Sequence, residues 1–248
     1  MHKLDWRWTL KSWISSPLAW MIACGFFTIH FLMDSLGDDR SLPWFRELGL
    51  SGRGMADLKW WQLLSYGALH GSFAHAILNG LLLLAIGSRI SAIAGHRMML
   101  ISFFSGILAG GVAYLLLGGM MDPATVLVGC SGGCMALMLM LTTLSPDSRM
   151  MPLGLSARNV GLGILISSLL LAMANPDVGI PVFASFGDWL VKRGLGSWFQ
   201  MSHACHLGGA VSGWILARWM LRPRVSLHRL KKQRVAAEQR AADRFLDS

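Results

Sequence analysis

The chain has 248 residues, of which 54% are hydrophobic and only 14% are charged. An average soluble domain is about 25% charged, so this composition excludes an ordinary soluble domain and indicates several membrane-spanning helices. The net charge of +9 does not indicate nucleic-acid binding, because membrane topology accounts for where the basic residues lie.

The chain begins with a polar, basic segment, residues 1–16, that also holds three tryptophans. We predict an amphipathic cytoplasmic lead-in at the membrane surface. The apolar run at 17–33 lacks a small-residue cleavage site, so it is predicted to be an uncleaved first span rather than a signal peptide. Residues 34–68 mix charges with aromatic pieces such as Trp60-Trp61, which predicts a folded loop that partly enters the headgroup region.

Five more apolar runs follow, so the predicted fold is an all-α polytopic membrane protein, a bundle of six transmembrane helices. The predicted spans after the first are residues 69–90, 98–118, 131–144, 160–174 and 204–221. The membrane domain then covers 17–221, and 222–248 is a basic cytoplasmic tail that is predicted to be helical. The long loop 175–202 is rich in aromatic residues, and we expect it to cap the site as an apolar flap.

The orientation follows from the lysine and arginine residues near the span ends. Sixteen of the 22 lie on the side that the two termini share with the connections 89–97 and 145–158. Both termini are therefore expected to be cytoplasmic, in a multi-pass protein of a cell membrane such as a bacterial inner membrane. The basic tail is better explained by anionic lipid than by nucleic acid.

The fourth predicted span is short. Its 14 residues, 131–144, give a helix of roughly 21 Å at about 1.5 Å per residue, whereas the hydrocarbon core is about 30 Å thick. If the helix ends at the cytoplasmic boundary, Ser131 lies roughly 10 Å below the outer surface. A helix that begins inside the membrane needs a wet or protein-lined environment for its free N–H groups. We therefore predict a water-filled pocket that opens outward, with Ser131 at its floor.

Ser131 and His206 are the candidate catalytic residues. Ser131 lies among glycines in Gly129-Cys130-Ser131-Gly132-Gly133, and His206 opens the last apolar run. A histidine can take the hydroxyl proton of a serine and pass it to a leaving group. No acidic residue was found inside a predicted span to orient the histidine, so a Ser–His dyad is expected rather than a triad. Gly209 and the glycine four residues later form a small-residue face that would let the fourth and sixth spans touch.

His75 and Asn79 are candidate oxyanion residues. They are four residues apart on one helix face and, with backbone N–H groups near Ser131, could donate to a developing oxyanion. Each polar residue alone has a structural explanation: a capping serine, an interhelical asparagine or an interfacial histidine. Their joint occurrence on three spans at compatible depth favours a catalytic site.

A metal site is an alternative use of the same region. Cys130 and Cys134 are four residues apart, and Cys205 lies between His203 and His206. Buried free cysteines are ordinarily small apolar residues, and neighbouring helical positions point in different directions, so this alternative is less favoured.

The chain resembles the rhomboid family of intramembrane serine proteases over roughly residues 60–220. The matching motifs are His70-x4-His75-x3-Asn79, Gly129-Cys130-Ser131-Gly132 and His206-Leu207-Gly208-Gly209-x3-Gly213. The resemblance implies Ser131 as nucleophile, His206 as general base, and His75 and Asn79 as oxyanion residues. It implies single-span membrane proteins as substrates, cut in or near their membrane segment, with no metal or cofactor.

Two positions depart from the family pattern. Family members often have Trp-Arg in the first loop, where this chain has Trp61-Gln62, and many carry a fifth-span tyrosine against the catalytic histidine, which residues 160–174 lack. The resemblance also extends to a subgroup that trims C-terminal sorting tails. The alternatives to a protease are an inactive relative that binds membrane segments and a small-solute transporter. The presence of both Ser131 and His206 argues against the first, and the lack of evident repeats or an intramembrane carboxylate argues against the second.

Overall fold

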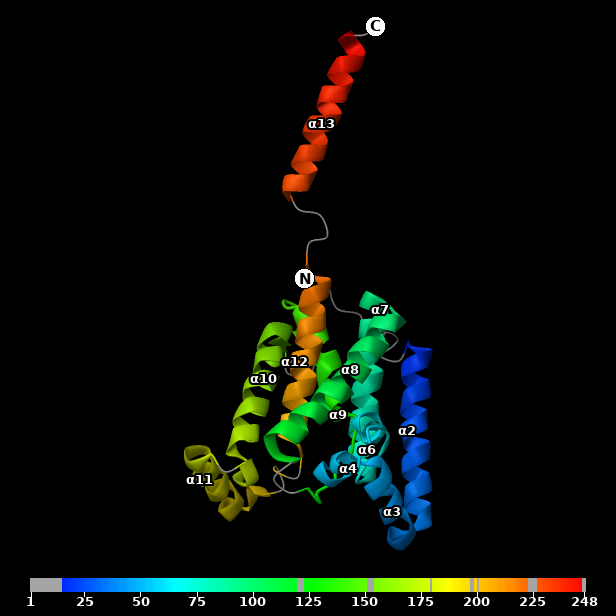
Figure 1. Ribbon diagram of the computed structural model, residues 1–248, viewed down its shortest axis with the longest axis vertical. Coiled ribbons are helices and arrows are strands. Elements are labelled where there is room, and N and C mark those ends of the chain that lie inside the picture. The colour runs from blue at the N-terminus through cyan, green and yellow to red at the C-terminus, as the bar shows by residue number, and fades with distance from the viewer. Residues whose placement is uncertain are drawn as a thin grey trace. The chain divides into compact units, whose positions relative to one another are not determined.

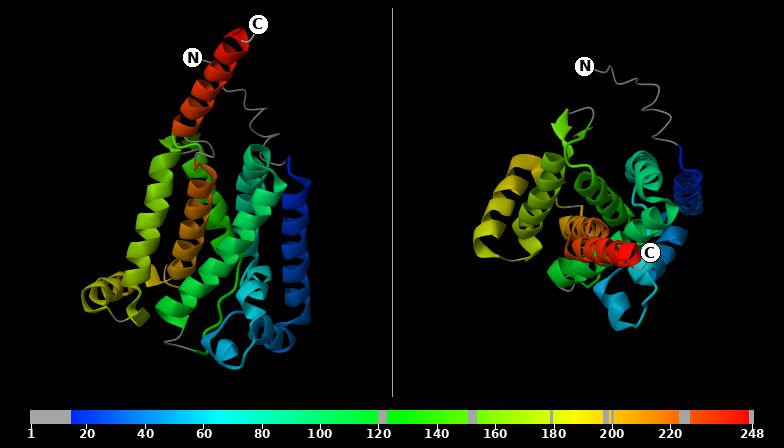
Figure 2. Two further views of the ribbon diagram at one scale, coloured as in Figure 1. Left: turned by 45° about the horizontal axis from the view of Figure 1, so that its top comes forward. Right: turned by 90° about the horizontal axis from the view of Figure 1, so that it is seen from above.

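The computed structural model describes residues 15–119, 123–150, 154–178, 180–196, 199, 201–222 and 227–246, and most of these residues are helical. The predicted lead-in at 1–16 lies almost wholly outside the described residues. Residues 1–217 form one compact unit and 218–248 a second. In the first unit, α2 (Pro17–Leu36) and α10 (Ala157–Ala174) lie on opposite sides of a helix bundle, with α12 (His203–Met220) between them (Figures 1 and 2).

The first span is α2, Pro17–Leu36, which is three residues longer than predicted. Ser16 caps its N-terminus by accepting a hydrogen bond from the Ala19 N–H, and Pro17 occupies the first turn, where no N–H is needed. Only Ala19 and Ala23 are buried along the helix. This helix therefore packs on the bundle along a narrow stripe and exposes the rest of its apolar surface.

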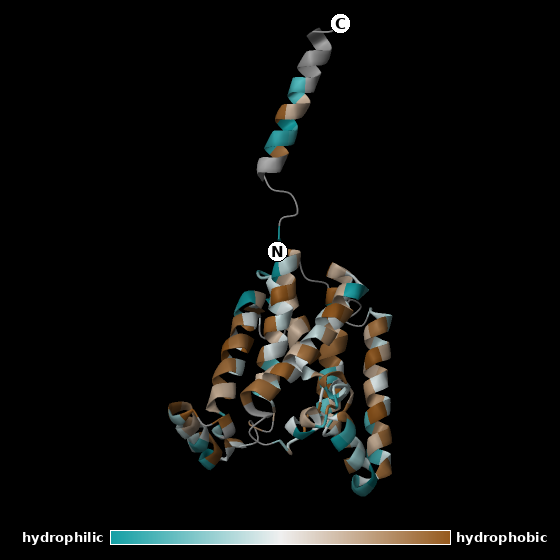
Figure 3. Ribbon diagram, viewed as in Figure 1, coloured by the Kyte–Doolittle hydropathy of each residue, from teal (hydrophilic) through white to brown (hydrophobic). Residues whose placement is uncertain are grey.

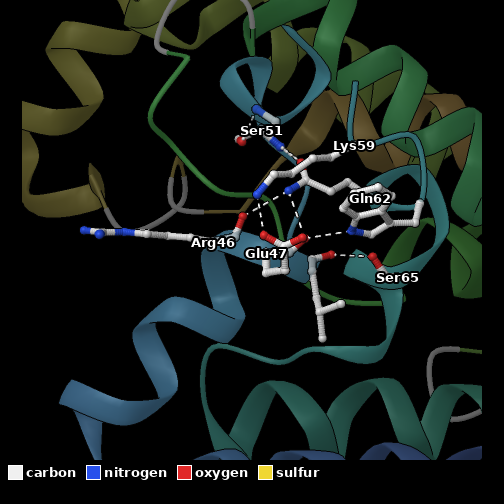
Figure 4. Close-up of polar contacts among 9 residues, drawn as sticks. Arg46, Glu47, Ser51, Lys59, Gln62 and Ser65 are labelled. Atoms are coloured by element: carbon white, nitrogen blue, oxygen red, sulfur yellow. Dashed lines mark hydrogen bonds and ion pairs between the residues drawn. The ribbon is translucent and has the colours of Figure 1, made fainter. Parts of the chain in front are cut away.

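The first loop is folded, as predicted, and consists of short helices. These are α3 (Asp38–Leu48), α4 (Gly52–Ala56), α5 (Gln62–Ser65) and the 3-10 helix η1 (Tyr66–Ala68). Gln62 is fully buried and holds the loop together (Figure 4). Its Nε2 donates to the carbonyls of Arg46 and Glu47, and its Oε1 accepts from the Ser51 N–H. The glutamine that stands where the family has arginine thus closes this loop by hydrogen bonds.

The second span begins later than predicted. The helix starts at Phe73, not at residue 69, because Leu69 is extended and the Ser72 side chain caps the new N-terminus by accepting from the His75 N–H. The span runs through α6 (Phe73–Leu82), a π turn η2 (Leu83–Gly87) and α7 (Ser88–Ala94). At its far end, the Ser88 Oγ accepts a hydrogen bond from the Ser16 N–H. His70 therefore lies in the turn before the helix and not on it.

The centre of the bundle is α9, Ser131–Leu144, whose bounds match the predicted span. Nine of its residues are buried, namely Gly132, Gly133, Cys134, Ala136, Leu137, Leu139, Met140, Leu141 and Thr142. It packs against α8 (His96–Tyr114), which continues into the π turn η3 (Leu115–Gly119). Gly106 of α8 lies so close to Ala136 and Gly132 that no larger side chain fits.

The fifth span is α10, Ala157–Ala174, and a short hairpin with two residues in each strand precedes it. In the hairpin β1 (Arg149–Met150) pairs antiparallel with β2 (Leu155–Ser156). The loop predicted at 175–202 contains η4 (Pro176–Val178), α11 (Pro181–Leu190) and the π turn η5 (Val191–Leu195). Gly187 of α11 packs directly on the Ala174 carbonyl at the end of α10. The expected role of this loop as a flap stays a prediction.

The sixth predicted span corresponds to α12, His203–Met220, and the basic tail contains α13, Leu227–Leu246. Four stretches of the described chain are long and apolar enough to cross a membrane: Pro17–Leu36, Phe73–Ala94, His96–Leu117 and Ala157–Ala174. Helix α9 is apolar but shorter, and α12 is not among the four. In Figure 3, brown hydrophobic residues recur along α2 and α10, between paler ones. The chain is an all-α polytopic membrane protein, and the count of six spans stays a prediction.

Candidate active site

Ser131 is the first residue of α9 and follows a tight turn. Gly129 in that turn has φ +110°, a backbone conformation that favours glycine. The first loop holds the turn from one side: the Gly129 N–H donates to the Tyr66 carbonyl at 2.9 Å, and Leu50 and Leu127 exchange backbone hydrogen bonds of 3.0 and 2.8 Å. At the first helical position, the Ser131 N–H has no carbonyl of its own helix to bond. It is therefore left to donate to another group.

His206 lies in the first turn of α12 and meets Ser131. The His206 Nε2 and the Ser131 Oγ are 2.9 Å apart, a hydrogen bond in which the hydroxyl donates when Nε2 carries no proton. Both side chains are partly buried. The structure thus brings together two sequence-predicted residues that are 75 positions apart.

Glycine contacts between α9 and α12 make this pairing possible. A methyl group on Gly209 would overlap the Gly132 carbonyl, and one on Gly213 would overlap the Ala136 carbonyl. The two backbones are therefore in direct contact, as the small-residue spacing predicts. This close approach sets the distance between the serine at the start of α9 and the imidazole on α12.

His75 and Asn79, both on α6, point at the turn before Ser131. A Cβ built on Gly129 would lie 2.8 Å from the His75 Nε2 and 3.6 Å from the Asn79 Nδ2. The Asn79 side chain is buried, and its Nδ2 has no hydrogen-bond partner among the described residues. Leaving a buried donor unpaired costs about 1–3 kcal/mol, so such a group is usually kept for a ligand or a reaction. These two donors converge on one point beside the serine.

Two further histidines, His203 and His70, pack against the candidate site residues. The His203 ring meets the His206 ring edge-on, with centroids 5.9 Å apart. The His70 ring meets the His75 ring edge-on at 5.1 Å, and the His70 carbonyl contacts the His30 Nδ1 at 3.2 Å. His203 thus supplies an aromatic neighbour for His206 in a chain whose fifth span has no tyrosine. Its position one helical turn before His206 is the signal that could have suggested this contact.

The three buried cysteines near the site face three different partners. The Cys130 Sγ contacts the His70 Nε2, the Cys134 Sγ donates to the Asn79 carbonyl, and the Cys205 Sγ contacts the Tyr66 hydroxyl. Among the residues that the structure describes, no three His, Cys, Asp or Glu side chains form a group that could hold a metal ion, so nothing in the structure favours the alternative of a Cys/His metal site. The three cysteines serve as small side chains that tie the helices of the site together.

The fold and this arrangement describe an all-helical, multi-pass membrane protein with a serine–histidine pair beside two converging donors. The family model of the Rhomboid domain matches residues 57–223, which is more than half of the chain. The chain belongs to the rhomboid family, whose members are typically intramembrane proteases. A comparison with curated proteins found no match.

Proposed function

We propose that this protein is an intramembrane serine protease that uses Ser131 as nucleophile and His206 as general base. The observation that supports this most directly is the 2.9 Å contact between the Ser131 Oγ and the His206 Nε2. A nucleophile and a base within hydrogen-bond reach are the minimum that acyl transfer by a serine requires. Membership of the rhomboid family supports the same reaction class.

In the first step, the Ser131 Oγ attacks the carbonyl carbon of the scissile peptide bond while its proton passes to the His206 Nε2. The tetrahedral intermediate then collapses, the C–N bond breaks, and His206 returns the proton to the leaving nitrogen. Water deprotonated by His206 attacks the acyl-enzyme and restores Ser131. The edge-on contact with the His203 ring supports a fixed orientation of the partly buried His206 imidazole during these proton transfers.

The oxyanion of the intermediate needs preorganised donors. The Ser131 N–H, the Asn79 Nδ2 and the protonated nitrogen of His75 are the groups that we assign to it. The unpaired Asn79 Nδ2 is the strongest support for this assignment, because a substrate oxygen beside Gly129 would satisfy it. Such donors stabilise charge only where it develops, which is why they lower the barrier rather than merely tighten binding.

The short α9 gives the reaction its place in the membrane. Its 14 residues span only about 21 Å, so Ser131 is expected below the headgroup level, in a pocket that admits water from outside. We infer that the substrates are membrane proteins cut in or near a single transmembrane segment, and that both termini of the protease are cytoplasmic. Trimming of C-terminal sorting tails is one form of this activity.

Labelling with a fluorophosphonate probe in detergent tests the proposal. Wild type should label, whereas Ser131→Ala should not and His206→Ala should label at background, because the hydroxyl is unreactive without its base. Ser102→Ala is a matched control, since Ser102 is a buried serine of the neighbouring helix α8. It should label like wild type.

Cleavage then identifies the reaction. Wild type and Ser131→Ala should be incubated with a panel of single-span substrates, including sorting-tail segments, in the same membrane mimetic. Cleavage by wild type alone is the expected result. Probe labelling that survives Ser131→Ala would contradict the proposal. A folded wild type that neither labels nor cleaves would also contradict it, and would favour the membrane-segment binder.

A further inference from the structure

A cavity of about 280 Å³ lies in the first loop, and none of its lining residues belongs to the candidate active site. Its walls come from the end of α3, from α4 and the turn after it, and from the segment 123–126. The Arg53 N–H donates to the Pro123 carbonyl, which joins the two walls. A single water needs only about 10–15 Å³ of such volume, so the cavity has room for a group the size of a phosphate.

The charged side chains of the lining are mostly positive. Arg46, Arg53 and Lys59 line the cavity together with a single carboxylate, Asp57. Lys59 is paired with Glu47, whereas neither arginine forms an ion pair within the described part of the chain. Figure 4 shows the Arg46 side chain extended away from the Lys59–Glu47 pair, so Glu47 does not neutralise it. The cavity therefore offers two free guanidinium groups to an anion.

The donor set suits a phosphate. Guanidinium groups bind phosphate oxygens through paired N–H donors. The Ser51 Oγ in the same wall accepts a hydrogen bond from the Gly54 N–H, so its own proton is left to donate. All three side chains line the one cavity.

Exposed aromatic residues set the depth of the cavity. Trp44 is 50% exposed and lies two residues before Arg46, and Trp60 is 61% exposed and follows Lys59. Exposed tryptophans of a membrane protein lie at the level of the lipid headgroups. The anions concentrated at that level are lipid phosphates, and a net positive lining favours lipids whose phosphate is not neutralised by an ammonium group of their own.

We propose that this cavity, lined by Arg46, Arg53 and Ser51, binds the phosphate of an anionic phospholipid. The binding does not depend on the proposed protease chemistry, because no residue of the cavity contacts Ser131 or His206. The lipid would join α4 to the segment 123–126, which leads along the chain to the turn before α9.

Native mass spectrometry of the full-length protein in neutral detergent tests this, with phosphatidylglycerol as the added probe. The double variant Arg46→Gln/Arg53→Gln should bind the lipid at least tenfold more weakly than wild type. The matched control Arg40→Gln/Lys192→Gln removes two exposed cations that do not line the cavity, and it should stay within twofold of wild type. Every variant keeps the basic tail, so lipid bound to the tail contributes equally to all of them.

Two further arms exclude other sources of the effect. Asp57→Asn removes the only carboxylate of the lining and should tighten binding severalfold, a result that loss of folding cannot produce. Inorganic phosphate at millimolar concentration should displace the lipid poorly, and phosphatidylcholine should bind more weakly than phosphatidylglycerol. Equal weakening in the control double variant, no change in Asp57→Asn, or ready displacement by inorganic phosphate would each overturn the proposal.

Discussion

Two regions hold the segment around Ser131, and they do so by opposite means. On one side, Gly209 and Gly213 of α12 bring two backbones into contact because they have no side chain. On the other side, the first loop meets the segment through the Leu50–Leu127 pair, and the loop itself is closed by one buried amide, Gln62. The first contact is steric and leaves no space, whereas the second is a set of hydrogen bonds.

The difference determines how each region responds to change. A steric contact between backbones cannot relax around an added group, so any enlargement must move a whole helix. A hydrogen-bonded loop can lose one partner and stay partly ordered, at the cost of the groups left unpaired. We therefore expect changes on the α12 side to abolish the site and changes in the first loop to weaken it.

The largest effect is expected for Gly213→Leu. The new side chain would overlap the Ala136 backbone, so α12 must move away from α9 and take His206 from Ser131. We expect a loss of about 3 kcal/mol or more of stability and background labelling by a fluorophosphonate probe. Thermal melting in detergent and probe labelling measure the two effects.

Gly25→Leu in α2 is the matched control for this substitution. A Cβ at Gly25 has nothing within 4 Å, so the same change on a span that packs along a narrow stripe should leave melting and labelling close to wild type. If the two leucine variants behaved alike, the steric account of the α9–α12 contact would be wrong.

The next largest effect is expected where both regions meet, beside Gly129. Asn79→Ala and His75→Ala should each lower the cleavage rate by roughly 100–1000-fold, the usual cost of one oxyanion donor. Because the Asn79 Nδ2 has no hydrogen-bond partner within the described part of the chain, Asn79→Ala should leave the melting temperature nearly unchanged. Steady-state kinetics on a cleaved substrate provide the measurement, and wild-type rates in either variant would remove that residue from the site.

A smaller effect is expected for Gln62→Leu. It would leave the Ser51 N–H and two carbonyls without their partner, which costs about 2–3 kcal/mol, and activity should fall about tenfold as the Leu50–Leu127 pair loosens. Lys59→Gln is the control in the same loop, because it breaks only a partly exposed ion pair and should cost under about 1 kcal/mol. Similar melting temperatures for the two variants would show that Gln62 does not hold the loop together.

The smallest effect is expected at His203. Removing its ring in His203→Ala should lower kcat about three- to tenfold, since an aromatic pair contributes about 0.5–1.5 kcal/mol. His203→Phe keeps an aromatic ring and should restore most of the rate. If His203→Phe lowered kcat as much as His203→Ala, then His203 would not act through the contact between the two rings.

The sequence predicted the features that depend on local pattern. The apolar run after Ser131 gave the correct bounds of α9, and the four-residue spacing of Gly209 and Gly213 predicted the contact with that helix. His75 and Asn79 were placed on one face because helical periodicity needs no tertiary information. These residues also carry the family motifs, so pattern and resemblance pointed to the same site.

What the sequence did not predict depends on contacts between distant segments. The start of the second span was wrong by four residues, because an apolar residue such as Leu69 does not show that Ser72 will cap the helix. The hydrogen bonds of Gln62 reach residues 11 to 16 positions away in an irregular loop, where no periodicity applies. The spacing of His203 and His206 on one helix follows from the sequence. Whether their rings touch depends on the orientation of the His206 side chain, which the sequence does not show.

The π turn Leu83–Gly87 divides the second span into two helices of different phase. A π turn holds one residue more than an α turn, so everything after it is rotated by about 100° relative to what precedes it. This offset lets Asn79 face the turn at Gly129 while Ser88 accepts from the Ser16 N–H at the other end. A single-residue deletion in the π turn would leave an equally apolar span, but only one of those two residues could keep its place.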